Sequence, residues 1–218
     1  MKSVLLSKCI NYYYRLKREK WLKHIRKENK NHEFCLIAND CIGGVLCHDL
    51  GEQFRSPMVN VGVPNDCYLD LMKNLEYYFS CDVIEIPDES KPYPVGMIIP
   101  RDDQHIPIRL DFVHDKSFQE AYAKWSKRLP RVNYDQLYFI WHYYDDEDNI
   151  DKLKEFDNWE ARKLAIIHNP INGIRCCSVV DCYNENPYSG KILEIINRTG
   201  KRYLDDVNYL DFLNGKGK

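Results

Sequence analysis

The sequence predicts an α/β protein with three layers: a mixed, mostly parallel sheet with helices on both faces, preceded by an N-terminal amphipathic helix. From residue 33 onward, short apolar runs rich in β-branched and aromatic residues alternate with segments of helical periodicity. Each crossover has to return across the sheet, which makes successive strands parallel and places helices on its faces. We expect a helix over residues 1–30, one α/β domain over 31–214 and a loose tail over 215–218.

The first segment has helical spacing of apolar residues, with lysine and arginine on its other faces. Residues 1–30 contain ten Lys and Arg against two Glu, a charge of +8; since the whole chain carries −2, the remainder carries −10. A basic amphipathic helix suits an anionic membrane surface. Packing on its own domain or on a second subunit is the alternative. Nucleic acid is disfavoured, because the acidic remainder would repel phosphate.

The remaining elements follow from local pattern and capping signals. Helix signals include Gly51 after the first short helix and the Ser117–Glu120 capping box. The predicted strands are 34–38, 58–63, 82–86, a hairpin of 95–99 and 106–113, then 137–141 and 164–167, with 174–180 and 192–196 at one edge. The predicted helices are 42–50, one helix from 64 through 79, one starting at 118, one around 150–159 and a short closing helix over 203–213.

Nine cysteines are scattered along the chain with no C-x-x-C pair, which favours reduced thiols and a cytoplasmic location. Lys8 interrupts the apolar start too early for an export signal, and no apolar run approaches the roughly 20 residues that span a bilayer. We therefore expect a cytoplasmic protein, peripheral at the inner face of the plasma membrane if the first helix docks there.

Three histidines close apolar runs at predicted strand exits: His114, His142 and His168. Ligands of open α/β sheets bind outside the carboxyl ends of the strands. His114 is the candidate general base, since histidine transfers protons near neutral pH. Cys41, after the first strand, lies at a helix N-terminus that stabilises a thiolate, although its neighbour Asp40 opposes one. Cys41, Asp40 and His114 are the candidate catalytic residues.

The candidate substrate-binding residues are of three kinds. Paired glycines at a strand-to-helix turn allow an anionic group to approach the backbone, although neither a dinucleotide fingerprint nor a Walker loop is present. The arginines can bind phosphate or simply lie on the surface, and the rest line the predicted pocket. The full set is Asn39, Gly43, Gly44, Ser56, His142, His168, Arg128 and Arg131.

The sequence shows no required cofactor. Residues 145–148, next to His142, are all acidic and offer ligands for a divalent cation, with a solvated loop as the alternative. The cluster of Cys176, Cys177 and Cys182 lacks the spacing of a zinc site.

Several motifs in order resemble the bacterial family DUF1919, whose members are often labelled exopolysaccharide or capsule biosynthesis proteins. These motifs are Asn39-Asp40-Cys41-Ile42-Gly43-Gly44, Leu50-Gly51, Phe54-Arg55-Ser56-Pro57, Tyr93-Pro94-Val95-Gly96, Phe112-Val113-His114-Asp115-Lys116-Ser117, Lys124-Trp125, Arg128 and Arg131-Val132-Asn133. Ile42 stands where the family commonly has an aromatic residue, and Lys127 where it usually has arginine. The resemblance covers residue 33 to about His168 and implies a setting, surface-glycan assembly, without a mechanism.

We weigh three functions. The first is a transferase that modifies or extends a cell-surface polysaccharide precursor, with His114 deprotonating an acceptor hydroxyl and the turn of residues 41–44 holding an anionic donor. The second is a hydrolase or acyltransferase in which Cys41 attacks and His114 is its base. The third is a non-catalytic glycan-binding or assembly partner. The expected partners are a glycan precursor and an activated sugar or acyl donor; the sequence leaves the oligomeric state open.

Overall fold

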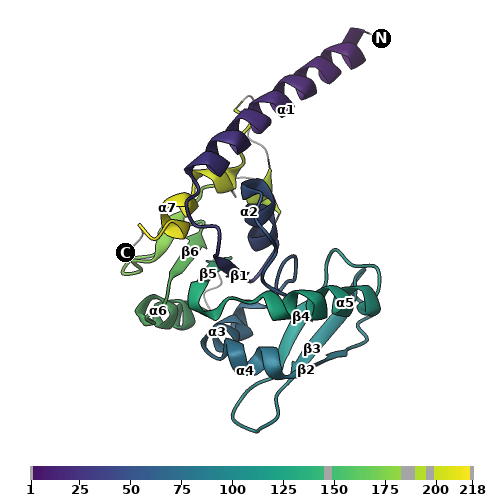
Figure 1. The fold of residues 1–218 in the computed structure, drawn as a ribbon, viewed down its shortest axis with the longest axis vertical. Helices are drawn as coiled ribbons and strands as arrows, with labels where there is room; N and C mark the ends of the chain where they lie inside the picture. The colour runs from purple at the N-terminus through teal and green to yellow at the C-terminus, as the bar shows by residue number, and fades with distance from the viewer. Residues whose placement is uncertain (1, 145–148, 183–189, 195–198, 217–218) are drawn as a thin grey trace.

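The computed structural model describes residues 2–144, 149–182, 190–194 and 199–216, and it confirms the α/β class (Figure 1). The helices are α1 (Lys2–Glu28), α2 (Ile42–Leu50), α3 (Asn65–Lys73), α4 (Leu75–Ser80), α5 (Phe118–Arg128), α6 (Ile150–Asn158) and α7 (Tyr209–Leu213). The strands are β1 (Cys35–Ala38), β2 (Asp82–Glu85), β3 (Val95–Ile99), β4 (Ile108–Asp111), β5 (Leu137–His142), β6 (Lys163–Ile167) and β7 (Cys177–Val179).

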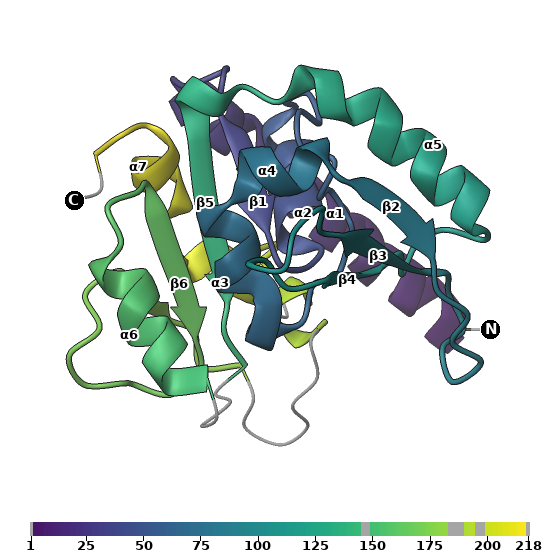
Figure 2. The same cartoon turned by 90° about the horizontal axis from the view of Figure 1, so that it is seen from below.

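The main sheet has the strand order β1-β5-β6-β7, and every pair in it is parallel. Its side chains alternate between two apolar cores: Ile37 and Trp141 contribute to one, Leu36 and Ile140 to the other. The first core is closed by α3, α4 and α6, and the second by α1, α2 and α7. In Figure 2, α3 and α6 lie in front of β5 and β6 while α1 and α7 lie behind. The three predicted layers are therefore present.

The antiparallel hairpin forms as predicted, but outside the main sheet. β3 pairs with β4 and also with β2, giving a separate sheet of order β2-β3-β4. Helix α5 covers this sheet with Ala121 and Trp125. The hydroxyl of Ser117 accepts the Glu120 N–H at 3.3 Å, so the helix begins at the predicted capping residue.

The prediction of a strand over residues 58–63 is wrong. The N–H of Val61 donates to the carbonyl of Met58, and Asn60 has a φ of 63°, so the chain turns here. Only Gly62 makes a β-bridge, to Asp111. The apolar residues of this segment are buried without a ladder, because the segment wraps around the exit of β1.

Two predicted helices are interrupted. The described part of one predicted edge strand is not a strand. The helix from residue 64 divides at Asn74, whose φ of −120° and ψ of 34° are not helical. The closing helix is a 3-10 turn (Tyr203–Asp206) followed by α7. Lys191–Leu193 form a 3-10 turn in place of the strand predicted over 192–196, whose last two residues lie outside the described segments. In the predicted tail, Gly215 and Lys216 donate backbone hydrogen bonds to α7.

The C-terminal half of α1 is fastened to the body, while its N-terminal half extends beyond it (Figure 1). Ile25 is fully buried between α1 and α2. The guanidinium of Arg18, 8% exposed, forms ion pairs with Asp49 and Asp205. No helix in the described residues is both long and apolar enough to cross a membrane.

Candidate functional site

The carboxyl edge of the parallel sheet gathers the polar residues that follow its strands. Asn39 and Asp40 come directly after β1, His142 ends β5, and His168 follows β6. Because these strands are parallel neighbours, their ends meet at one edge. The structure thus brings together four residues that the sequence placed at separate strand exits.

Asn39 joins the ends of β1 and β5. Its side-chain amide donates to the carbonyl of His142 and its oxygen accepts the His142 N–H, each at 2.9 Å. The same amide donates to Asn65 Oδ1 at 3.2 Å, which also accepts the indole N–H of Trp141 at 2.8 Å. Asn39 is 3% exposed, so its role is to continue the strand pairing by one residue.

Asp40, His142 and His168 form a chain of short hydrogen bonds. Asp40 Oδ2 lies 2.6 Å from His142 Nδ1, and His142 Nε2 lies 2.8 Å from His168 Nε2. His168 Nδ1 lies 2.8 Å from the carbonyl oxygen of Val180. His142 is fully buried and His168 is 5% exposed, so solvent reaches this chain mainly at the Asp40 end.

The proton count of this chain determines its charge. A carbonyl oxygen only accepts, so His168 Nδ1 carries a proton toward Val180. The contact between His142 and Asp40 requires a second proton, and the contact between His142 and His168 requires a third. Two neutral imidazoles carry two protons between them, so this chain holds one extra. Counting one proton for each of these three contacts gives the histidine pair one positive charge when Asp40 is ionised.

The environment of Asp40 keeps it ionised. Burial alone raises the pKa of this carboxyl group, but the charge and hydrogen bond of His142 outweigh burial and bring the pKa below its usual value. The Ile42 N–H donates to Asp40 Oδ1 at 2.8 Å, and the Tyr144 hydroxyl donates to Oδ2 at 2.7 Å. Asp40 is therefore a fixed carboxylate that receives four hydrogen-bond and charge interactions from three residues.

Cys41 and His114 form a second pair, at the solvent-facing side. Cys41 Sγ lies 3.0 Å from His114 Nε2, and the side chain of His114 is exposed. Burial, followed by the charge of Asp40, raises the pKa of the Cys41 thiol to about 11. The sulfur therefore keeps its proton at neutral pH, and the tautomer of His114 decides which of the two atoms donates in this contact. This result weighs against the thiolate that the helix N-terminus was expected to stabilise.

A cavity of about 290 Å³ opens beside both pairs. Two carboxylates, Asp40 and Asp111, and two tyrosines, Tyr93 and Tyr144, face it. The full lining is Asn39, Asp40, Cys41, Gly62, Val63, Pro64, Tyr93, Asp111, Val113, Tyr144, Gly190 and Leu193. His114 lies at its rim, since its neighbour Val113 lines the cavity and its ring contacts Cys41. His142 and His168 lie behind Asp40 and do not line it.

Gly43 and Gly44 pack against the protein and do not line the cavity. A Cβ on Gly43 would lie 3.2 Å from that of Ala38, and one on Gly44 would lie 2.1 Å from Asn60 Oδ1. The glycines allow α2 to approach neighbouring backbone closely. One N–H of the helix N-terminus is also taken, because Asp40 accepts the Ile42 N–H. The expected anion-binding turn at residues 41–44 therefore has a structural role.

Three other predicted binding residues stabilise a loop away from the cavity. Ser56 is 1% exposed and its hydroxyl accepts the Met58 N–H at 3.0 Å. Arg128 donates to the carbonyl of Val59 at 3.0 Å, and Arg131 to that of Phe54 at 3.2 Å. Both guanidinium groups thus bind backbone oxygens of this protein, and the loop over residues 54–59 gains its position from them.

Sequence reasoning missed four residues of the site: Tyr93, Asp111, Tyr144 and Asn65. Tyr144 follows His142 by two residues, so strand alternation could have placed both on the Asp40 side. Asp111 lies at the cavity because it forms a β-bridge with Gly62, which also lines the cavity. No local sequence pattern predicts that pairing.

Among the described residues, no cluster of three or more His, Cys, Asp or Glu side chains is arranged to hold a metal ion. The acidic residues 145–148 lie outside the described segments, so a divalent cation there stays a prediction. Every cysteine whose side chain the structure describes is a free thiol.

Comparison with known proteins gives a family. An uncharacterized protein of Haemophilus influenzae is 25% identical over 193 residues, which cover 87% of this chain and 88% of that protein. The motifs alone suggested a likeness ending near His168, but the family match continues through β7 and α7. The profile of a domain of unknown function, DUF1919, matches residues 12–214, and the chain belongs to that family.

Proposed function

We propose that this protein is a transferase that acts on a hydroxyl-bearing acceptor, with His114 as the general base. The contact of 3.0 Å between His114 Nε2 and Cys41 Sγ carries the proposal, because it fixes a basic nitrogen at the rim of the cavity. The acceptor we propose is a precursor of a cell-surface polysaccharide, and the donor an activated sugar or acyl group. We place the reaction in the cytoplasm.

The reaction requires one proton transfer and one exchange of bonds. The acceptor hydroxyl displaces the Cys41 thiol from His114 Nε2 and gives its proton to that nitrogen. The oxygen then forms a bond to the electrophilic carbon of the donor. The bond from that carbon to the leaving group breaks, and its electron pair departs with the leaving group.

The lining of the cavity supports a neutral, polyhydroxylated ligand. Asp40 and Asp111 offer carboxylate oxygens that accept hydrogen bonds from hydroxyl groups. Tyr93 and Tyr144 offer ring faces and hydroxyls. Neither carboxylate is an isolated charge, since Asp111 pairs with Arg109 at 2.9 Å and Asp40 with His142 at 2.6 Å.

A second function uses Cys41 as the nucleophile of an acyl transfer, with His114 accepting the thiol proton. The same Cys41–His114 distance favours it. Two features oppose it: the raised pKa of Cys41, and the Ile42 N–H, which is already bonded to Asp40 and cannot stabilise an oxyanion.

The test is a screen of nucleotide-sugars and acyl-CoAs against simple sugar acceptors, read as release of nucleoside diphosphate or free CoA by chromatography. For the donor that reacts, His114→Ala is expected to lower the rate by about 10²- to 10⁴-fold. Cys41→Ala is expected to lower the rate less than His114→Ala, because it removes the contact that positions His114 but leaves the base itself. His48→Ala, whose side chain is 74% exposed, is the matched control.

Equal losses in Cys41→Ala and His114→Ala would assign the reaction to the cysteine. Rapid labelling of Cys41 by iodoacetamide, located by mass mapping, would accompany that outcome. Thermal stabilisation by a glycan without turnover of any donor would favour a binding protein and contradict the proposal.

A further inference from the structure

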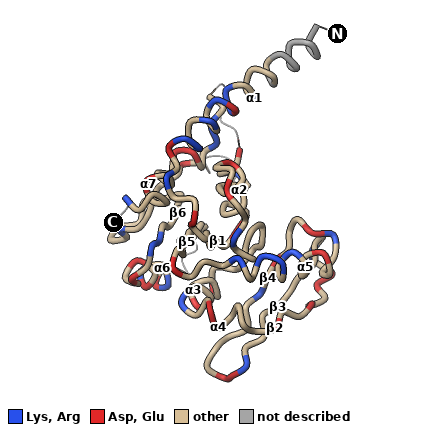
Figure 3. Tube along the Cα trace, viewed as in Figure 1, with Lys and Arg blue, Asp and Glu red and all other residues tan. Residues whose placement is uncertain are grey.

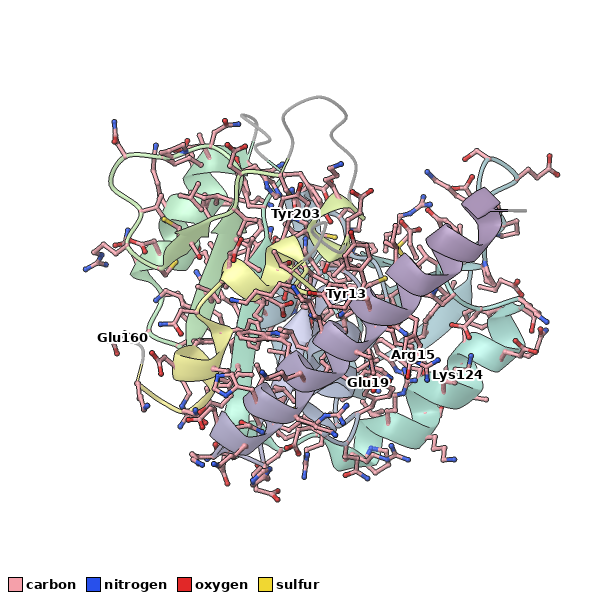
Figure 4. All side chains as sticks on the ribbon, turned by 90° about the horizontal axis from the view of Figure 1, so that it is seen from above. Tyr13, Arg15, Glu19, Lys124, Glu160 and Tyr203 are labelled. Atoms are coloured by element: carbon pink, nitrogen blue, oxygen red, sulfur yellow. The ribbon has the colours of Figure 1, made fainter. Side chains whose placement is uncertain are left out.

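The N-terminal half of α1 exposes apolar side chains that nothing in the described protein covers. Ile10, Tyr12, Tyr13 and Leu16 are 41%, 63%, 52% and 45% exposed. The N-terminal half of the helix extends beyond the body (Figure 1). Figure 4 shows Tyr13 on one side of this helix, with Arg15 and Glu19 on the other. Large apolar side chains grouped in this way mark an interaction surface.

The same side of α1 becomes basic toward the body. At 100° per residue, Lys20 and Lys23 follow Tyr13 and Leu16 along one side of the helix, each seven residues later. Both lysines are exposed. Arg18, by contrast, faces the body and is neutralised there by Asp49 and Asp205. Figure 3 shows the basic residues concentrated along this part of α1. The exposed lysines Lys20 and Lys23 thus lie on the side of the helix that carries Tyr13 and Leu16.

A basic pocket adjoins this surface where α1 meets the body. It has a volume of about 330 Å³ and is lined by Lys17, Lys20, Trp21, His24, Thr199 and Lys201. The Lys201 ammonium lies 4.1 Å from the centre of the Trp21 ring, which positions that charge at the wall. Three lysines and a histidine line the pocket, and no acidic side chain of the described residues does. Its chemistry fits a phosphate group.

We propose that α1 docks on an anionic lipid bilayer, with Ile10, Tyr13 and Leu16 in the interface and a lipid phosphate in the basic pocket. This inference does not rest on the proposed reaction. Tyrosines beside lysines are the composition of helices that lie at membrane surfaces. A second copy packed in parallel on this side of α1 would bring its lysines against Lys20 and Lys23, whereas an anionic lipid surface complements them, so charge complementarity favours lipid.

The test is flotation of the full-length protein with vesicles of phosphatidylcholine alone or with phosphatidylglycerol added. Binding is expected only to the anionic vesicles and is expected to weaken with salt. Each lysine near such a surface contributes about fivefold to binding, so Lys20→Glu/Lys23→Glu should lower it by about 100-fold or more. Tyr13→Ser/Leu16→Ser is expected to lower it as well.

The control variant is Lys91→Glu/Lys116→Glu, which changes the net charge by the same amount at exposed sites outside α1. It should bind anionic vesicles better than Lys20→Glu/Lys23→Glu does. Circular dichroism checks that each variant folds. Equal loss in both charge variants, or no binding of the wild type to anionic vesicles, would overturn the proposal. Self-association of the wild type that Tyr13→Ser/Leu16→Ser abolishes would assign the surface to a second copy instead.

Discussion

At the scale of single residues, Asp40 connects the parts of the site. Its carboxylate accepts hydrogen bonds from the backbone of α2, from Tyr144 and from His142, while its side chain also faces the cavity. The buried histidine pair behind it supplies one compensating charge. Asp40 therefore presents a fixed negative charge to any ligand, and its protein partners determine that charge.

Asp40→Asn is expected to lower the free energy of unfolding at neutral pH by about 3 kcal/mol, because a buried ion pair loses one partner. The folded protein holds the pKa of Asp40 below the usual 3.8, so its stabilisation is present above that value and is lost as pH falls through the lower folded pKa. Urea unfolding of wild type and Asp40→Asn, at neutral pH and at a pH below the folded pKa of Asp40, measures this difference in stability. Exposed Asp103→Asn is the control, and a loss that does not shrink in acid would contradict the account.

The proton count makes a second prediction about the same residues. At neutral pH, nitrogen NMR of the assigned histidines should show three ring protons shared between His142 and His168. In Asp40→Asn the two rings should carry two protons, since the negative charge of the Asp40 carboxylate is gone. Two neutral rings in the wild-type protein would mean that Asp40 holds the third proton, which would refute the charge assignment.

The sequence allowed only part of this site to be predicted. Strand exits are visible as ends of apolar runs, and this is why Asp40, His114, His142 and His168 could be named. The sequence did not show that Ser56 and Arg128 bind backbone atoms, because their partners are chosen by tertiary contacts. A short apolar run looks alike in a strand and in a buried turn, and the segment over 58–63 is such a case.

At the scale of elements, capping residues gave the most reliable boundaries. Gly51, with a φ of 75°, ends α2, and Ser117 begins α5. Both signals act within a few residues, so the sequence contains them completely. The turn over residues 58–61 depends instead on Asn60 in the left-handed region, and its apolar neighbours gave the misleading impression of a strand.

Gly44→Ala should destabilise the protein by about 1–3 kcal/mol, because the new methyl group would lie 2.1 Å from Asn60 Oδ1. Asn60→Gly removes that side chain and suits the positive φ, so the double variant should recover part of the loss. Thermal or urea unfolding measures both. If Gly44→Ala were as stable as the wild type, the close approach of α2 to this turn would be contradicted.

At the scale of the whole molecule, the parallel order of the strands explains why the site lies where it does. β1, β5 and β6 end at one edge, and the loop over residues 58–63 and the end of β4 close the cavity from the side of the second sheet. The three layers could be predicted from alternation of strands and helices. The division into two sheets could not, because β2, β3 and β4 pair with one another and not with a strand of the main sheet, and these pairings are set by tertiary contacts.

The most direct measurement of the central claim is the rate of donor turnover by His114→Ala relative to wild type and His48→Ala. The account predicts a loss of about 10²- to 10⁴-fold for His114→Ala alone, with the unfolding temperature unchanged. Equal rates in all three proteins would contradict the assignment of His114 as the base.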